Sequence, residues 1–223
     1  MAFISDNYLL DNDSYKSYKT GDILLCSSGS QTPWPISWLS NLIKLGTKSA
    51  FTHVAIVLKN PHFIHPSLHG FYVWESSYES VPDPQDNKLK LGVRITPLSD
   101  FIEAFRKEGG TILHRSINCS ESHFSTKILE EVHQIVYDKP YDICPLDWIK
   151  AYFRGKGKKE DNTEPNGFWC SAFVGYVYMK CGILKPSVNW STLRPSDFAL
   201  ESTEKVLPFE ENCSLSNSET RLL

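Results

Sequence analysis

The chain has no apolar run near the length of about 20 residues that spans a bilayer, so no transmembrane segment is predicted. Its first residues, MAFISDNYLLDNDSY, lack the basic start and long apolar stretch of a secretion signal. No Cys-x-x-Cys pair is present either, because the six cysteines are scattered. Without a secretion signal, scattered cysteines indicate reduced thiols rather than a disulfide framework. We therefore expect a cytoplasmic protein with thiols available for chemistry.

An excess of charge of one sign is also missing. The formal net charge of −3 gives no general attraction to nucleic acid or to an anionic membrane, so no nucleic-acid partner is predicted. Apolar residues make up 41% of the chain and charged residues 22%, which is ordinary for a globular protein. A length of 223 residues suits one α/β or α+β domain and is short for two.

The sequence predicts one domain, residues 19–207, between a polar arm at 1–18 and a polar, disordered tail at 208–223. Alternating or β-rich apolar runs predict strands, and apolar residues at helical spacing predict helices. The expected strands are 21–26, 51–58, 71–75, 93–96 and 111–115, and the expected helices are 36–45, 97–107, 122–137 and 168–181. The charged stretch 154–166 is expected to be an exposed loop.

Cys170 is the first candidate for chemistry, because it follows Gly167 and begins an apolar helix. The positive end of the helix dipole and the unpaired backbone N–H groups there favour a thiolate. The same N–H groups can stabilise an oxyanion on an acyl substrate. The alternative is a buried structural cysteine, which is how we interpret Cys26, Cys144 and Cys181.

His53 lies within an apolar strand, where a single histidine is more often a hydrogen-bonded core residue. Its geometry with Glu75 favours a functional role. If the strands around the two residues pair antiparallel with His53 opposite Glu75, Leu58 lies opposite Gly70 and the turn-rich segment NPHFIHPSLHG forms the loop. Directly opposed side chains are close enough for Glu75 to orient the imidazole and stabilise its charge.

Two other patterns compete with this interpretation. Three histidines in the loop, His62, His65 and His69, have donor atoms for zinc, but their spacing fits no metal motif and the neighbouring prolines indicate turns. We therefore predict no metal site. The basic run 154–159 lacks the pattern and the preceding strand of a phosphate-binding loop.

Taken in order, these segments resemble a known family. They are Gly21-Asp22-Ile23-Leu24, Phe51-Thr52-His53-Val54-Ala55-Ile56-Val57, Glu75, Lys139-Pro140-Tyr141-Asp142 and Trp169-Cys170-Ser171. The set is similar to NlpC-type cysteine hydrolases of circularly permuted papain-like topology, in particular to the YiiX/YebB-like group, which includes proteins of large DNA viruses. The resemblance covers residues from about 19 to 200.

The resemblance implies an α+β fold in which a small antiparallel sheet packs against the helix of the nucleophile. It also implies Cys170 as nucleophile, His53 as base, Glu75 as orienting residue and Tyr141 as oxyanion donor, with no cofactor. The expected activity is hydrolysis of an amide, peptide or isopeptide-like, through a thioester. If the source is viral, association with the virion is a further expectation.

Two alternatives stay open at this point. The first is a thiol-dependent lipid acyl hydrolase or acyltransferase, because lecithin:retinol acyltransferase-like enzymes resemble the same family. The apolar side chains of Trp34, Ile36, Trp38 and Leu39 suit an acylated substrate or a peripheral membrane contact. The second is a non-catalytic binding module on the same fold, against which the Cys-His-Glu set argues.

Overall fold

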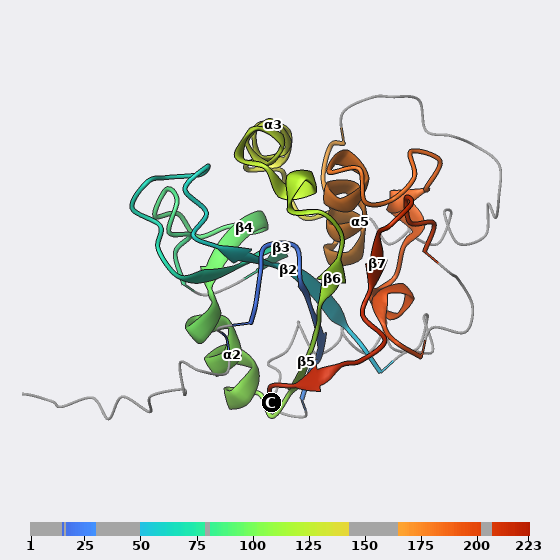
Figure 1. Cartoon of the computed structure of the whole chain (residues 1–223). Helices are drawn as coiled ribbons and strands as arrows, with labels where there is room; N and C mark the ends of the chain where they lie inside the picture. Colours follow the sequence, from blue (N-terminus) through green and yellow to red (C-terminus); the bar gives the residue numbers. More distant parts are fainter. Residues whose placement is uncertain (1–14, 16, 30–49, 79–80, 143–164, 202–206) are drawn as a thin grey trace, which may run out of the picture.

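The computed structural model describes residues 15, 17–29, 50–78, 81–142, 165–201 and 207–223. They form a mixed α/β domain with an antiparallel sheet and few helices (Figure 1). The strands are β1 (Ile23–Ser27), β2 (His53–Lys59), β3 (Phe71–Tyr78), β4 (Leu91–Pro97), β5 (Thr111–Arg115), β6 (Ile117–Asn118), β7 (Ser214–Leu215) and β8 (Thr220–Arg221). The α-helices are α2 (Leu98–Lys107), α3 (Thr126–Val136) and α5 (Cys170–Lys180), and the 3-10 helices are η1 (Glu121–Phe124), η2 (Trp190–Thr192) and η3 (Pro195–Phe198).

The main sheet is six-stranded in the order β4-β3-β2-β1-β5-β8, and β6 and β7 form a second, two-stranded sheet. Helices α3 and α5 lie on one side of the main sheet and α2 on the other (Figure 1). Strand β2 is buried on both faces for this reason. Its side chains Val54, Ile56 and Leu58 join the core under α5, and Ala55 and Val57 join the core under α2.

Helix α5 is central to the domain because its sequence is apolar on every side, and all its residues from Cys170 to Tyr178 are buried. Gly175 allows a close approach to the segment after η2, since a Cβ there would lie 2.5 Å from Cδ1 of Leu193. Gly182, with a φ of +68°, follows the helix in the left-handed conformation that suits glycine. The predicted helix at 168–181 is confirmed, two residues shorter at its start.

The pairing of β2 with β3 is confirmed, but the predicted register is wrong. Leu58 lies opposite Tyr72 rather than Gly70, so β3 is displaced by two residues along β2. A shift of two residues keeps every side chain on its expected face, because the side chains of a strand alternate. Apolar patterning therefore does not distinguish the two registers, and the loop closes through Asn60, whose N–H donates to the carbonyl of Gly70.

The two ends of the domain are more ordered than predicted. Strands β7 and β8 lie in the tail that was expected to be disordered, and Cys213 and Leu215 are buried there. Of the predicted polar arm, Tyr18 is buried and stacks on the ring of His114 with centroids 3.9 Å apart. Apolar side chains at a few positions are enough to fix these otherwise polar segments.

The predicted helix at 36–45, with Trp34 to Leu39 in the same segment, lies outside the described residues, as does nearly all of the predicted loop at 154–166. The predicted helix at 122–137 is divided, because Ser125 has an extended backbone between η1 and α3. Among the described residues, no helix has both the length and the apolar character needed to cross a membrane.

Candidate active site

The candidate site lies where β2 and β3 separate. The two strands are paired from the end of β2 back to Ile56, which lies opposite Trp74. Beyond that point β2 continues its pairing with β1 as far as His53, and β3 continues its pairing with β4 as far as Tyr78. Helix α5 begins at Cys170 and contacts both β2 and β3. Cys170 thereby reaches His53.

His53 is the first residue of β2 and its side chain is 15% exposed. Its Nε2 lies 2.7 Å from Oε2 of Glu75. The rings of Phe101 and Phe105 in α2 lie beside the imidazole, with centroids 6.2 and 6.4 Å away. The ring is therefore held by an ionic hydrogen bond and by aromatic neighbours, and Nδ1 is the nitrogen left for another partner.

Glu75 is fully buried in β3. Its second oxygen, Oε1, accepts a hydrogen bond of 3.0 Å from the hydroxyl of Thr96 in β4. Arg94, which is also fully buried, lies directly opposite Glu75 in the register and donates from Nε to Oγ1 of Thr96 at 3.2 Å. Both carboxylate oxygens are thus occupied, and a cation lies on the neighbouring strand, as a buried carboxylate requires.

Cys170 is the first residue of α5 and is buried. The preceding backbone is fixed to β3, since the hydroxyl of Ser76 donates to the carbonyl of Phe168 at 2.7 Å. The Cys170 side chain interacts with the imidazole of His53 and raises its pKa. The first turn of a helix has backbone N–H groups without intrahelical acceptors, so the thiol lies beside potential oxyanion donors.

The environment of His53 favours its protonated form. Burial alone lowers the pKa of this imidazole, but the hydrogen bonds and negative charges of Cys170 and Glu75 outweigh it and raise the pKa from 6.5 to about 10. An imidazole between a carboxylate and a thiol can therefore carry a proton at neutral pH. The arrangement suits a thiolate–imidazolium pair.

Tyr141 is held next to this pair by backbone hydrogen bonds. Its N–H donates to the carbonyl of Leu91, and it forms a parallel bridge with Phe168, two residues before Cys170. Burial and, to a smaller degree, the charge of Cys170 raise the pKa of the Tyr141 hydroxyl well above its usual range. The hydroxyl keeps its proton at neutral pH and can donate it in a hydrogen bond.

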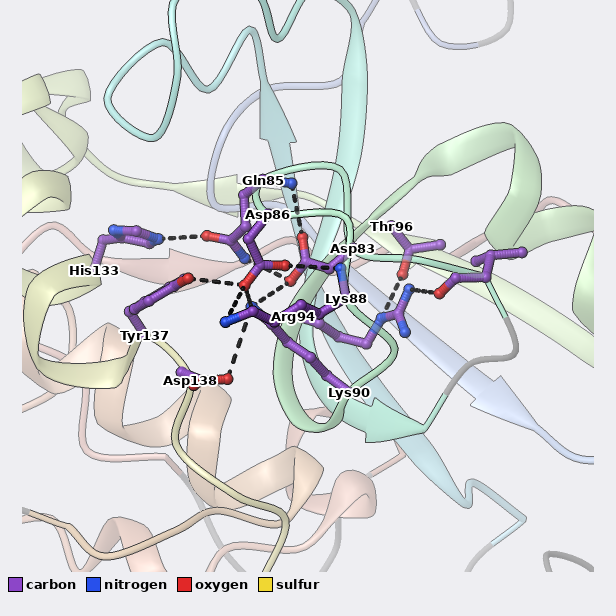
Figure 2. A network of polar contacts seen from close by, with 11 residues as sticks. Asp83, Gln85, Asp86, Lys88, Lys90, Arg94, Thr96, His133, Tyr137 and Asp138 are labelled. Atoms are coloured by element: carbon purple, nitrogen blue, oxygen red, sulfur yellow. Dashed lines mark hydrogen bonds and ion pairs between the residues drawn. The ribbon is translucent and has the colours of Figure 1, made fainter.

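The strand that carries Thr96 is anchored by a buried ion-pair network, shown in Figure 2. Nζ of Lys90, whose side chain is 5% exposed, lies 3.0 Å from Asp83 and 2.8 Å from Asp86. The hydroxyl of Tyr137, at the end of α3, donates to Asp86 at 2.8 Å. The network fixes the loop before β4 against α3. Arg94 appears at the other side of the same view, pointing toward Thr96 (Figure 2).

The structure brings together all four residues singled out in the sequence: Cys170, His53, Glu75 and Tyr141. Because of the register shift, His53 and Glu75 meet diagonally rather than face to face, which is within reach of these long side chains. Sequence reasoning missed Thr96, whose signal was its place in a short predicted strand with alternating polar residues.

The loop histidines lie elsewhere. Nε2 of His62 is 3.2 Å from Nδ1 of His69, while Nδ1 of His65 is 2.8 Å from the hydroxyl of Ser67. Within the described part of the chain, no group of three or more His, Cys, Asp or Glu side chains is arranged to hold a metal ion. The histidines are therefore divided between two separate local contacts.

Comparison with known proteins gives no assignment: no family model matches the chain, and no curated protein is significantly similar to it.

Proposed function

We propose that this protein is a cysteine hydrolase on a circularly permuted papain-like, NlpC-type fold, and that it cleaves an amide bond, peptide or isopeptide-like, through a thioester. One observation carries the proposal: the imidazole of His53 interacts with the Cys170 side chain and lies 2.7 Å from the buried Glu75 carboxylate. The order of these residues along the chain, with His and Glu before Tyr and Cys, supports the permuted topology because it resembles that of the YiiX/YebB-like group.

In the proposed resting state, Cys170 is a thiolate and His53 an imidazolium. A pKa of about 10 keeps the imidazole protonated at neutral pH. Glu75 holds the ring through Nε2 and stabilises its charge, so that the Nδ1–H points at the sulfur. The nucleophile is thereby prepared without a metal or an external base.

Acylation begins when the thiolate attacks the carbonyl carbon of the substrate. The oxygen takes the negative charge, and the first N–H groups of α5 and the hydroxyl of Tyr141 stabilise it. His53 then transfers its proton to the leaving amine, the carbon–nitrogen bond breaks, and a thioester on Cys170 is left.

Deacylation reverses the roles. His53 is now neutral, and it removes a proton from a water molecule that attacks the thioester carbonyl. The carbon–sulfur bond breaks, the acid product leaves, and the thiolate–imidazolium pair forms again. Each turnover consumes one water and returns the proton to the same nitrogen.

An acylated substrate is a second candidate, favoured by one feature of the surface. Leu89 and Leu91 are 61% and 47% exposed, and the carbonyl of Leu91 accepts the hydrogen bond from the N–H of Tyr141. Exposed apolar side chains on the segment whose backbone binds Tyr141 suit an acyl chain. The same thioester chemistry then gives a lipid acyl hydrolase or acyltransferase.

The decisive experiment incubates the protein with a panel of acylated peptides and a panel of phospholipids. Cys170→Ala tests the nucleophile. Cys181→Ala is the matched control, because Cys181 is buried just beyond the other end of the same helix. Thermal unfolding shows whether each variant is folded.

Peptide or isopeptide cleavage that is lost in Cys170→Ala and kept in Cys181→Ala supports the amide proposal. Release of fatty acid that depends on Cys170, with no peptide cut, establishes the lipid alternative. If neither panel reacts and a thiol-reactive acyl probe does not label Cys170 in the folded protein, the chain is a binding module and the enzymatic proposal is wrong.

A further inference from the structure

A second thiol–imidazole arrangement lies away from the candidate site, where β6 meets β7. The register pairs Asn118 with Ser214, and continuing it by one residue places Cys119 opposite Cys213. The side chains of the two cysteines interact, and both thiols are free. Directly opposed residues of antiparallel strands have Cβ atoms about 4.5–5.5 Å apart, and disulfides need about 3.5–4.5 Å. A small movement is therefore enough to join the two sulfurs.

His123, in η1, gives this pair a base. Its Nδ1 lies 2.9 Å from the carbonyl oxygen of Cys181. A carbonyl only accepts, so Nδ1 carries the hydrogen and Nε2 of the neutral ring presents its lone pair. Nε2 lies 3.7 Å from Sγ of Cys213. Hydrogen bonds thus run from Cys213 through His123 to the end of α5, with Cys119 beside Cys213.

The two thiols differ in access. Cys119 is partly exposed, whereas Cys213 is 7% exposed. Cys119 is therefore the thiol more open to a reagent from solution, and Cys213 is the one beside the imidazole. Disulfide exchange uses such a pair: one thiol attacks the external disulfide, and a second thiol then attacks the mixed disulfide and releases it.

We propose that Cys119 and Cys213 form a redox-active dithiol that reacts with low-molecular-weight disulfides such as oxidised glutathione, with His123 as base. The Cys119 thiolate attacks one sulfur of glutathione disulfide, giving a mixed disulfide and one glutathione. Cys213 then loses its proton to His123 and attacks the Cys119 sulfur, and the second glutathione leaves with that proton. The two protein thiols are oxidised by two electrons, and one glutathione disulfide is reduced to two thiols.

The bond would tie the C-terminal segment to the body of the domain. That segment carries β8, which pairs with β5 at the edge of the main sheet. Its Ser216 carbonyl accepts a hydrogen bond of 2.7 Å from Nε of Arg115. The disulfide closes a long loop in the unfolded chain, so the oxidised protein should unfold at a temperature roughly 5–10 °C higher.

Reaction in the folded protein is expected to be slow. Burial raises the pKa of Cys119 to about 11, and burial also raises the pKa of Cys213, so little thiolate is present at neutral pH. The proposal concerns these two thiols alone and does not depend on the role of Cys170.

The test incubates the folded chain with oxidised glutathione, alkylates the remaining thiols and maps every cysteine by mass spectrometry. Cys170→Ala is treated in parallel, so that an adduct on that thiol is not mistaken for the dithiol reaction. We expect a Cys119–Cys213 cross-linked peptide, reversible by dithiothreitol. In Cys213→Ser, a stable glutathione adduct should stay on Cys119. In His123→Gln, which keeps a donor for the carbonyl but no base, cross-linking should slow by at least about tenfold while the adduct accumulates.

Two results would overturn the proposal. One is a folded protein in which Cys119 takes up glutathione without forming the cross-link. The other is a cross-link that joins a different pair of cysteines in the folded protein, because the native geometry at β6 and β7 would then contribute nothing. A His123→Gln variant that cross-links at the rate of the unaltered chain would remove the imidazole from the reaction and refute the assigned base.

Discussion

Glu75→Gln gives the sharpest test of the site, because it removes one charge and almost no volume. Nε2 of His53 lies 2.7 Å from the buried carboxylate, and the pKa of His53 is raised from 6.5 to about 10. That difference corresponds to about 5 kcal/mol in favour of the imidazolium, shared between Glu75 and Cys170. A nearby opposite charge commonly contributes about 1–3 pH units. In the variant we therefore expect the His53 midpoint between roughly pH 7 and 9.

Because the pKa of His53 is raised in the folded protein, the proton on this imidazole stabilises the fold over a defined pH range. The folded pKa of His53 lies above its unfolded value, so the stabilisation from its proton is complete below pH 6.5 and is lost as the pH rises through about 10. In Glu75→Gln this loss should occur at lower pH. The alkaline limb of kcat/KM should move down with it, because the leaving amine needs the imidazolium proton.

The measurement is a titration of the imidazole carbon-bound hydrogens by nuclear magnetic resonance, with the His53 signal assigned from its absence in His53→Ala. Thermal unfolding checks that Glu75→Gln is folded, since Arg94 is buried on the neighbouring strand. The reasoning fails if the unaltered chain titrates near 6.5, or if the midpoint is the same with Gln at position 75.

Three further outcomes are expected. Tyr141→Phe should lower kcat by about 10–100-fold with little change in KM, since the α5 N–H groups keep part of the oxyanion stabilisation. A rise in KM by the same factor, with kcat unchanged, would instead indicate a substrate-binding role. Thr96→Val removes the hydroxyl bound to the carboxylate at 3.0 Å and should shift the imidazole pKa, because the group that charges the ring loses a donor, and Thr96→Ser should restore it. A pH profile unchanged in Thr96→Val would assign Thr96 a packing role only. Replacing the three loop histidines His62, His65 and His69 by alanine should leave activity nearly intact. A metal mechanism would be established if this variant is inactive and if the unaltered chain, inactivated by a chelator, regains activity when zinc is added.

Much of the local structure follows from the order of apolar residues. The helix that begins at Cys170, the helix after Pro97 and the strand at His53 are each predicted within a few residues, because their periodicity and end signals are local. The same periodicity places His53 and Glu75 on one face of adjacent strands. The sequence alone therefore predicts His53 and Glu75 as neighbours, and only the resemblance to NlpC-type hydrolases adds Cys170 to them.

The register of β3 along β2 does not follow from the apolar pattern. Displacing β3 by two residues leaves every side chain on its face, so the choice depends on the loop that closes at Asn60 and Gly70 and on what enters between the strands. Beyond Ile56 and Trp74, where the pairing ends, the hydroxyl of Ser76 donates to the backbone carbonyl of Phe168. Such a contact joins residues 92 positions apart in the chain, and no local pattern encodes it.

The polar partners of the site residues and the strands at the end of the chain also depend on contacts between distant segments. Thr96 is bound to Glu75, and Cys119 faces Cys213, only because separate strands pair. The tail reads as polar and disordered, yet β8 pairs with β5 because a sheet edge offers unpaired backbone groups whatever the side chains are. The local order of apolar residues therefore encodes the main strands and helices and the face that each side chain occupies, since both depend on neighbours a few positions away. The register, the partners of the buried polar groups and the order of the tail depend instead on backbone and side-chain contacts between distant segments.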